Sequence, residues 1–240
     1  EIASCLVGSE MCIRDSSHNS HLSHLSHNFS RPQPAMKTYK MYRTSINARY
    51  VDEIVEHLRR GGLVIYPTDS LYAIGCDALQ NRAVERVCRL KDINPAKQRL
   101  SIVCADISQA SEYARIDNEA FRLMRANLPG PFTFILPATT RLSKAFKGRK
   151  EVGVRVPDNA IATTLAEALG NPLLSAAALW PDAGEDADPC RPEVLETHYA
   201  RDVDVLIDGG DVPDRETAVV SLLDGDPEIL REGPRELSEV

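Results

Sequence analysis

Two hydroxyls and a carboxylate follow the short apolar segment 63–66 and carry the clearest chemical potential in the chain. Gly-Gly precedes this segment and Pro67 ends it, a pattern typical of a buried strand. The next three residues are Thr68, Asp69 and Ser70. Polar groups at the end of a buried strand often build ligand sites in α/β proteins. The same side chains could instead serve only to cap an ordinary turn.

Arg155 is a second candidate, because it interrupts the apolar strand pattern of residues 152–156. Period-two alternation places its side chain on the face opposite Val154 and Val156. An unpaired buried charge is costly, so this arginine must find an anionic partner. The partner could be a structural acid of the protein, or a substrate carboxylate or phosphate that the guanidinium grips as a fork.

The composition is that of a folded globular chain, with 43% hydrophobic and 26% charged residues. No segment approaches the roughly 20 apolar residues of a membrane-spanning helix, so we expect no membrane partner. The net charge of −7 argues against a broad nucleic-acid-binding surface, although Lys and Arg concentrate at 86–99 and 141–150. The six cysteines form no CxxC pair, which predicts no zinc knuckle or thioredoxin-type site and favours a cytoplasmic location.

Residues 1–35 differ from the rest of the chain. Ser-His pairs recur every third residue in this segment, and such a low-complexity tract cannot build a core. Its beginning lacks the basic start and apolar stretch of a secretory signal, and residues 4–16 resemble translated adapter sequence. We expect 1–35 to be a disordered, non-native leader, with Met36 or Met41 as the natural start.

Helical and strand patterns alternate through the remainder, with no internal repeat. This interleaving predicts one α/β domain with a large mixed sheet. No GxxxxGK[ST], GxGxxG, HExxH or GxSxG motif occurs, so nucleotide chemistry would need dispersed cationic and hydroxyl groups. Helical periodicity covers 51–58, 84–91, 121–128 and 161–169, and strand patterns cover 63–66, 100–104, 132–136, 152–156, 173–175, 203–207, 218–222 and 228–231.

Residues 61–77, GGLVIYPTDSLYAIGCD, resemble the signature of the YrdC-like family, typified by threonylcarbamoyl-AMP synthase. In that family a strand ends in Pro-Thr-Glu and runs on into Tyr-Gly-Leu-Gly. Here Asp69 replaces the glutamate, as in the YciO-type branch, and Tyr72 begins Tyr-Ala-Ile-Gly. Further matches keep the family's order across 44–235, which implies a single YrdC-like domain with a large twisted mixed sheet flanked by helices. They are Pro129-Gly-Pro-Phe-Thr133, Arg155-Val-Pro157, and the strands near Thr217 and Arg231.

Lys91 matches the lysine of the family's Lys-x-Arg motif, whose charges bind nucleotide phosphates, but Ile93 stands in the arginine position. Isoleucine cannot replace a bidentate guanidinium. Lys97 or Arg99 could supply the missing charge. From the residues alone, Lys91 could simply be a lysine favoured at a helix C-terminus by the helix dipole.

Ser175 matches the serine of the family's Ser-x-Asn motif, but Ala177 replaces the asparagine, as in YciO-type relatives. Alanine offers neither the donor nor the acceptor of an amide. These losses weaken the transfer of the family's full activity to this chain. Thr133 starts a strand after a rigid Pro-Gly-Pro turn, so its role could be purely structural.

The family reaction joins L-threonine, bicarbonate and ATP to give threonylcarbamoyl-AMP and pyrophosphate, in the pathway that modifies adenosine 37 of tRNA. The resemblance therefore implies a nucleotidyltransferase with these substrates and Mg²⁺, and no metal site on the protein itself. The alternative is an RNA-binding module for double-stranded RNA without efficient catalysis. The implied catalytic residues are Lys91, Arg155 and Ser175, and the implied substrate contacts are Thr68, Asp69, Tyr72, Thr133, Thr217 and Arg231.

Overall fold

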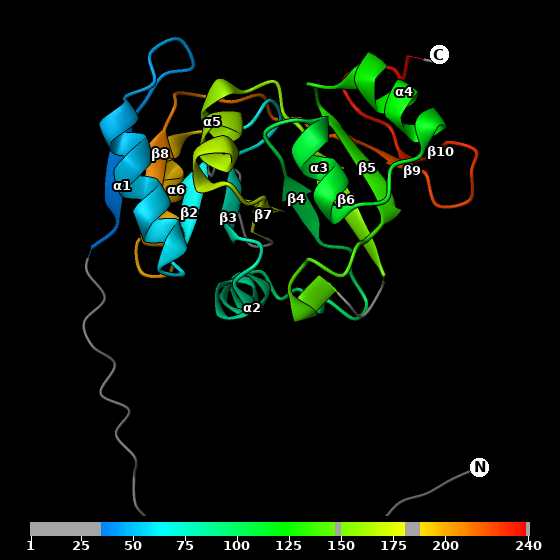
Figure 1. Ribbon diagram of the computed structural model, residues 1–240. Coiled ribbons are helices and arrows are strands. Elements are labelled where there is room, and N and C mark those ends of the chain that lie inside the picture. The colour runs from blue at the N-terminus through cyan, green and yellow to red at the C-terminus, as the bar shows by residue number, and fades with distance from the viewer. Residues whose placement is uncertain (1–34, 147–149, 181–187, 239–240) are drawn as a thin grey trace, which may run out of the picture. The chain divides into compact units, whose positions relative to one another are not determined.

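The computed structural model describes residues 35–146, 150–180 and 188–238, so nearly all of the expected leader lies outside the described residues. Within them, ten strands form one mixed sheet in the order β1-β8-β2-β3-β7-β4-β6-β5-β9-β10 (Figure 1). The strands are β1 (Lys37–Lys40), β2 (Val64–Tyr66), β3 (Ala73–Asp77), β4 (Ser101–Val103), β5 (Phe132–Pro137), β6 (Glu151–Arg155), β7 (Leu173–Ala177), β8 (Val205–Asp208), β9 (Ala218–Ser221) and β10 (Glu228–Arg231).

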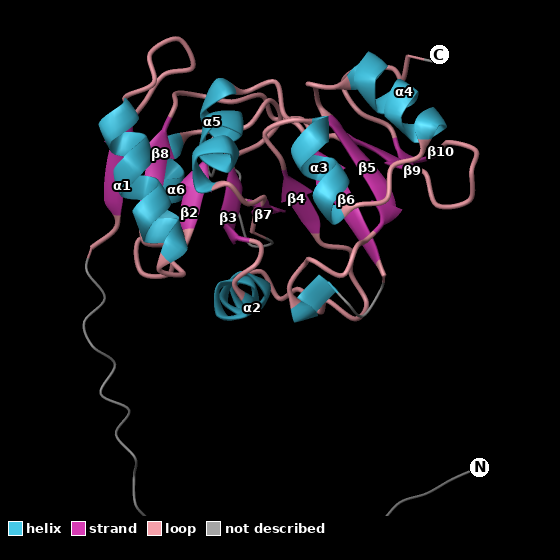
Figure 2. Cartoon of the chain, in the orientation of Figure 1, coloured by secondary structure: helices cyan, strands magenta, loops and turns pink. Residues whose placement is uncertain are grey.

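Helices flank this sheet, as the sequence pattern predicts (Figure 2). Two helices, α3 and α6, and two strands, β1 and β3, occur where no element was expected. Of these, β1 precedes residue 44, where the family resemblance begins. The helices are α1 (Ala48–Arg59), α2 (Asn81–Leu90), α3 (Ile107–Tyr113), α4 (Asn118–Asn127), α5 (Ala160–Leu169) and α6 (Pro192–Tyr199), with a short 3-10 turn, η1 (Lys144–Phe146).

The local sequence accounts for the bounds of α5, the helix nearest the candidate site. Asn159 caps its N-terminus, because the Asn159 side chain accepts a hydrogen bond from the Ile161 backbone N–H at 3.0 Å. Gly170 ends it in the left-handed conformation, with φ of 74°, which a glycine adopts without steric cost. Its apolar stripe packs beside α1 on the sheet (Figure 1).

Two apolar clusters cover opposite faces of the sheet. Neighbouring residues of one strand fall into different clusters: Tyr66 belongs to the cluster under α1 and α5, and Ile65 to the larger cluster with α2 and α6. Leu173 and Leu174 divide in the same way. Such alternation is the consequence of the strand period of two. It places Arg155 on the Tyr66 face and Val154 on the other, as the sequence predicted.

Candidate functional site

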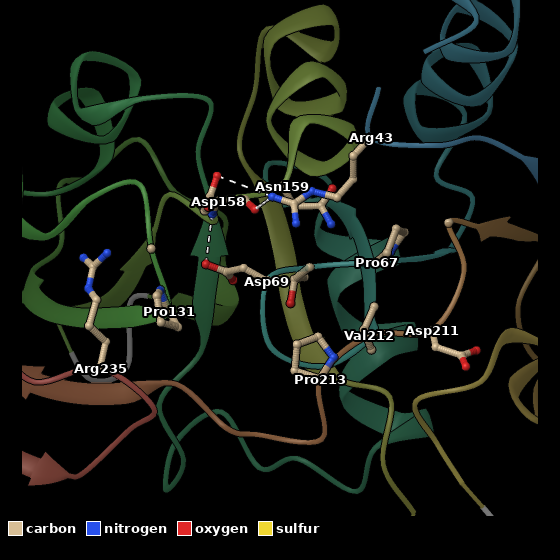
Figure 3. Close-up of a pocket in the computed structure, with 13 residues that line it drawn as sticks. Arg43, Pro67, Asp69, Pro131, Asp158, Asn159, Asp211, Val212, Pro213 and Arg235 are labelled. Atoms are coloured by element: carbon tan, nitrogen blue, oxygen red, sulfur yellow. Dashed lines mark hydrogen bonds and ion pairs between the residues drawn. The ribbon is translucent and has the colours of Figure 1, made fainter. Parts of the chain in front are cut away.

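Arg155, at the end of β6, meets the turn that follows β2. Its Nη2 donates to Ser70 Oγ at 2.9 Å, Asp69 Oδ1 at 3.2 Å and Thr68 Oγ1 at 3.4 Å. The second Asp69 oxygen accepts a hydrogen bond from the Asp158 backbone N–H at 2.9 Å (Figure 3). Both charged side chains are buried, with 11% of Arg155 and 7% of Asp69 exposed. The arginine therefore has a protein carboxylate as its partner.

The electrostatics of this pair are those of a buried, compensated charge. Burial lowers the pKa of Arg155, and the adjacent Asp69 carboxylate opposes that shift. Thr68 is also engaged within the turn, because its hydroxyl donates to the Leu71 carbonyl at 2.6 Å and accepts from the Ser70 N–H at 3.1 Å. The Thr68–Ser70 turn is thus a rigid, preorganised unit. The two structural roles considered from the sequence, capping of the turn and an acid partner for Arg155, are both observed.

A cavity of about 240 Å³ opens beside this turn (Figure 3). Charges of both signs line it, which suits a ligand that carries both an ammonium and a carboxylate group. Arg43, from the loop after β1, pairs with Asp158 at 3.4 Å, and the Arg235 guanidinium stacks 4.7 Å from the centre of the Phe132 ring. The charged residues that line the cavity are Asp69, Asp158 and Asp211 together with Arg43 and Arg235.

A second cavity, of about 310 Å³, contains two arginines and two hydroxyls among its lining groups: Arg99, Arg231, Ser101 and Thr133. Thr133 Oγ1 lies 2.9 Å from Thr217 Oγ1, and Arg231 Nε donates to the Thr217 carbonyl at 3.0 Å. The fold thus brings together three residues that the resemblance singled out, although they come from β5, β10 and the segment before β9. This arrangement of cations and hydroxyls is suited to phosphate groups.

Both arginines of the second cavity already hold a carboxylate. Arg99 Nε lies 3.0 Å from Glu151, and Arg231 Nη1 lies 2.6 Å from Glu216. Each arginine side chain is about two-fifths exposed, so these pairs can exchange with a ligand. Arg99 lines the cavity and Lys97 does not, so Arg99 is the better candidate for the charge missing at Ile93.

Lys91 and Tyr72 make contacts that hold loops in place. Lys91 Nζ donates to the Leu179 carbonyl and lies 3.5 Å from the Tyr199 hydroxyl, and burial lowers the pKa of this lysine. The Tyr72 hydroxyl donates to the Gly210 carbonyl at 2.7 Å and accepts from the Gly209 N–H at 3.1 Å. Ligand contacts for these two residues stay predictions.

The two departures from the family motifs leave apolar groups at their positions. Ile93 packs against the larger apolar cluster. Ala177 lies at the end of β7, opposite Ala73 on β3, so two methyl groups meet there. Ser175, two residues earlier, remains on β7 between Gly75 and Ser101.

Four charged residues that line the first cavity escaped sequence reasoning: Arg43, Asp158, Asp211 and Arg235. Arg43 and Arg235 lie near opposite ends of the described chain, outside any motif, so no local signal could have linked them to the Thr68–Ser70 turn. Asp158 directly follows the Arg155-Val-Pro157 motif, and its proximity to that motif was the one available signal.

The described residues contain no group of three or more His, Cys, Asp or Glu side chains that could hold a metal ion. The Mg²⁺ implied by the resemblance therefore stays a prediction. In the same part of the chain, no helix is long and apolar enough to cross a bilayer.

Fold and site together define an α/β protein in which two polar cavities adjoin a large mixed sheet. The family model Sua5_yciO_yrdC, described as "Telomere recombination", matches residues 56–233. The chain belongs to the Sua5/YciO/YrdC family.

Individual relatives agree with this assignment. YciO of Escherichia coli (strain K12) is 40% identical over 187 residues, which are 77% of this chain and 89% of YciO. Its crystal structure matches with a TM-score of 0.76 at 36% identity, over 84% of this chain and 97% of YciO. The predicted family and fold class are confirmed.

Two further relatives have names that refer to chemistry. Threonylcarbamoyl-AMP synthase of Vibrio vulnificus (strain YJ016) is 33% identical over 132 residues, covering 53% of this chain and 70% of that protein. The structure of P. abyssi Sua5 complexed with L-threonine matches with a TM-score of 0.73 at 27% identity, over 82% of this chain and 57% of Sua5.

Proposed function

We propose that this protein is a nucleotide-binding enzyme of the threonylcarbamoyl-AMP synthase type. The observation that carries the proposal is the second cavity, where Thr133 and Arg231, with Thr217 behind them, converge from distant parts of the chain. The names of the Vibrio vulnificus and P. abyssi relatives support L-threonine and an adenylate as the chemistry. The substrates would be ATP, L-threonine and bicarbonate.

The two cavities suggest a division of roles. Arg99 and Arg231 would bind phosphate oxygens of ATP, and Thr133 would add a hydroxyl donor. The cavity beside Asp69 would hold the amino acid through its carboxylates and arginines. The threonine nitrogen would bond to the bicarbonate carbon with loss of water, and the resulting carbamate oxygen would bond to the α-phosphorus as pyrophosphate leaves.

Lys91 and Ser175 are the remaining catalytic residues that the family resemblance implies, and their roles depend on this reaction. To reach a phosphate, Lys91 would exchange the Leu179 carbonyl for a phosphate oxygen. With Ile93 and Ala177 in the motif positions, one charge and one amide are missing, so we expect slower turnover than in relatives that keep both.

The test is pyrophosphate release by the full chain with ATP, L-threonine and bicarbonate. Release should require all three substrates, and Arg231→Ala should lower kcat/KM about a hundredfold, because a preorganised phosphate contact is lost. Arg141→Ala is the matched control, since Arg141 also pairs with an exposed acid, Glu112, but lines neither cavity. Pyrophosphate release that does not require L-threonine would count against the proposal. An equal loss of kcat/KM in Arg231→Ala and Arg141→Ala would also count against it.

Binding of double-stranded RNA is a second candidate, and one observation favours it. The second Lys/Arg-rich stretch contacts α2, the helix that leads into the first one, because the Lys144 N–H donates to the Asn81 side chain at 2.8 Å and joins η1 to α2. Ion pairs reduce the available charge, since Arg86 holds Asp204 at 3.2 Å. Affinity for an RNA duplex that falls steeply with salt would support this candidate, and no binding even at low salt would exclude it.

A further inference from the structure

A surface groove runs between α4 and the loop that joins β9 to β10, at the β10 edge of the sheet (Figure 1). It consists of two cavities, of about 490 and 460 Å³, which share four lining residues and are therefore continuous. We call it the α4 groove. Among the described residues, it shares no lining residue with the two cavities assigned to substrates, so it is a separate surface. Its larger apolar lining residues include Ile116, Leu123, Leu222, Leu223, Ile229 and Leu237.

Ile229 forms an exposed apolar wall of this groove. A bulge interrupts the regular alternation of side chains along β10, so that Ile229 lines the groove whereas Leu230 and Arg231 both line the second cavity. Ile229 is 46% exposed, and Leu222 and Leu223, in the loop before β10, are only partly buried. Apolar surface left in water along a groove is typical of a docking site for another molecule.

Carboxylates surround the half of the α4 groove that contains Ile229. Asp117, Glu119 and Asp226 line this half together with one described cation, Arg122. Asp117 caps α4, because its side chain accepts hydrogen bonds from two backbone N–H groups at 3.1 and 2.8 Å. Glu119 and Asp226 form no ion pair within the described part of the chain. Their charge is therefore available to a cationic partner.

Apolar walls next to free carboxylates suit lysine and arginine side chains. Such side chains bury their alkyl stems along apolar surface and keep the charged head at a polar rim. A second copy of this chain fits poorly, because a twofold interface brings the same patch of both subunits together. It would set Asp226 and its exposed neighbours Asp224 and Glu228 against the same acids. An anionic membrane surface meets the same repulsion.

We propose that the α4 groove docks a segment of a partner protein in which apolar residues alternate with lysine or arginine. The apolar residues cover Ile229 and Leu222, and the cations pair with Glu119 and Asp226. Electrostatic complementarity selects the partner and speeds its association, while burial of apolar surface supplies most of the affinity. This proposal is independent of the proposed function, since none of these four residues lines a cavity assigned to substrates.

The probe is a fluorescein-labelled decapeptide of alternating leucine and lysine, and the matched control peptide has glutamate in place of lysine. Fluorescence anisotropy measures the Kd of each peptide for the full chain at about 0.15 M salt. The leucine–lysine peptide should bind saturably, and its Kd should rise with salt. The leucine–glutamate peptide should bind about tenfold more weakly or worse. Equal affinities for the two peptides, or no saturable binding of the lysine peptide, would overturn the proposal.

Two pairs of variants locate the bound peptide. Asp226→Lys should raise the Kd about tenfold, whereas Glu167→Lys, which makes the same charge change on an exposed residue of α5, should leave it nearly unchanged. Ile229→Asn should also raise the Kd about tenfold. Phe121→Asn is its control and should not, because Phe121 is 43% exposed on α4 but does not line the groove. Equal losses within either pair would reject the groove as the docking site.

Other occupants of the groove would give different results. Sedimentation of the chain alone measures self-association, and dimers that Ile229→Asn converts to monomers would mean that a second copy covers the groove. Flotation with vesicles that contain phosphatidylserine measures membrane binding, and binding that Ile229→Asn abolishes would mean that the groove meets a lipid surface. Either result would overturn the proposal of a protein partner. Peptide binding without pyrophosphate release would retain the docking surface and reject only the synthase activity.

Discussion

At the scale of single residues, the Arg155–Asp69 pair is the chemical centre of the turn after β2. A buried guanidinium without a counter-charge is strongly unfavourable, so the chain supplies Asp69 and two hydroxyls around one nitrogen. The second oxygen of Asp69 accepts a hydrogen bond from the Asp158 backbone N–H. This bond fixes the segment that leads into α5, which explains why an aspartate is suitable at position 69. Arg155 thus stabilises the Thr68–Ser70 turn of the candidate site.

We expect Asp69→Asn to lower the free energy of unfolding by about 3 kcal/mol, because it keeps the shape of the side chain but leaves the Arg155 charge uncompensated. Urea denaturation of the two proteins measures this difference. Asp158→Asn serves as the control, since the Asp158 side chain is 71% exposed and pairs with Arg43, and its effect should stay within about 0.5 kcal/mol. Similar small effects in both variants would mean that Arg155 finds another anion.

At the scale of elements, Asp204 joins four parts of the fold just before β8. It accepts from the Leu63 N–H at 2.8 Å and lies 3.2 Å from Arg86 and 3.5 Å from His57. Burial raises the pKa of Asp204, but the nearby His57 ring, the hydrogen bond from the Leu63 N–H and the Arg86 charge outweigh it and bring the pKa to about 2. This carboxylate therefore links α1 and α2 to the strands that carry the site.

The lowered pKa of Asp204 predicts a pH-dependent contribution to stability. The ordinary value is 3.8 and the folded value about 2, so the contribution is complete above the ordinary value and is lost as pH falls toward 2. At about pH 6, Asp204→Asn should melt at a lower temperature than wild type, and the gap should close in acid. Glu56→Gln, in an exposed pair with Arg60, should melt like wild type throughout. A gap that persists below the folded pKa would contradict the assignment.

At the scale of the whole molecule, segments from both ends of the described chain close around the first cavity. Arg43 arrives from the loop after β1 and Arg235 from the segment after β10, and both line the cavity beside Asp69. Ligand binding at such a place ties together strands from the centre of the sheet and segments near its two edges. We therefore expect ligands to stabilise the fold globally.

ATP at about 100 times its Kd should raise the free energy of unfolding by about 2.7 kcal/mol, because a ligand that binds only the folded state shifts the equilibrium by mass action. Thermal melting at increasing ATP concentration measures this. Arg231→Ala should reduce the shift, and Arg141→Ala should preserve it. Identical melting curves with and without ATP would remove the support for nucleotide binding.

The local sequence pattern was sufficient to predict much of the fold. The apolar stripe of α1, the strand ending at Tyr66 and the face of Arg155 all follow from period and burial, which depend on near neighbours in sequence. It failed at β3, where Ala73 to Asp77 are all buried, because a strand covered on both faces shows no alternation. The helices α3 and α6 have only seven and eight residues, too few for a clear period.

The sequence by itself determined the family motifs, the α/β class and the residue types available for chemistry. Only the tertiary structure decided that Arg155 pairs with Asp69 and that Arg99 rather than Lys97 lines a cavity. The reason is physical. Side-chain periodicity is a local property, whereas the order and register of strands are set by long-range pairing, and that pairing brings distant residues within hydrogen-bond distance.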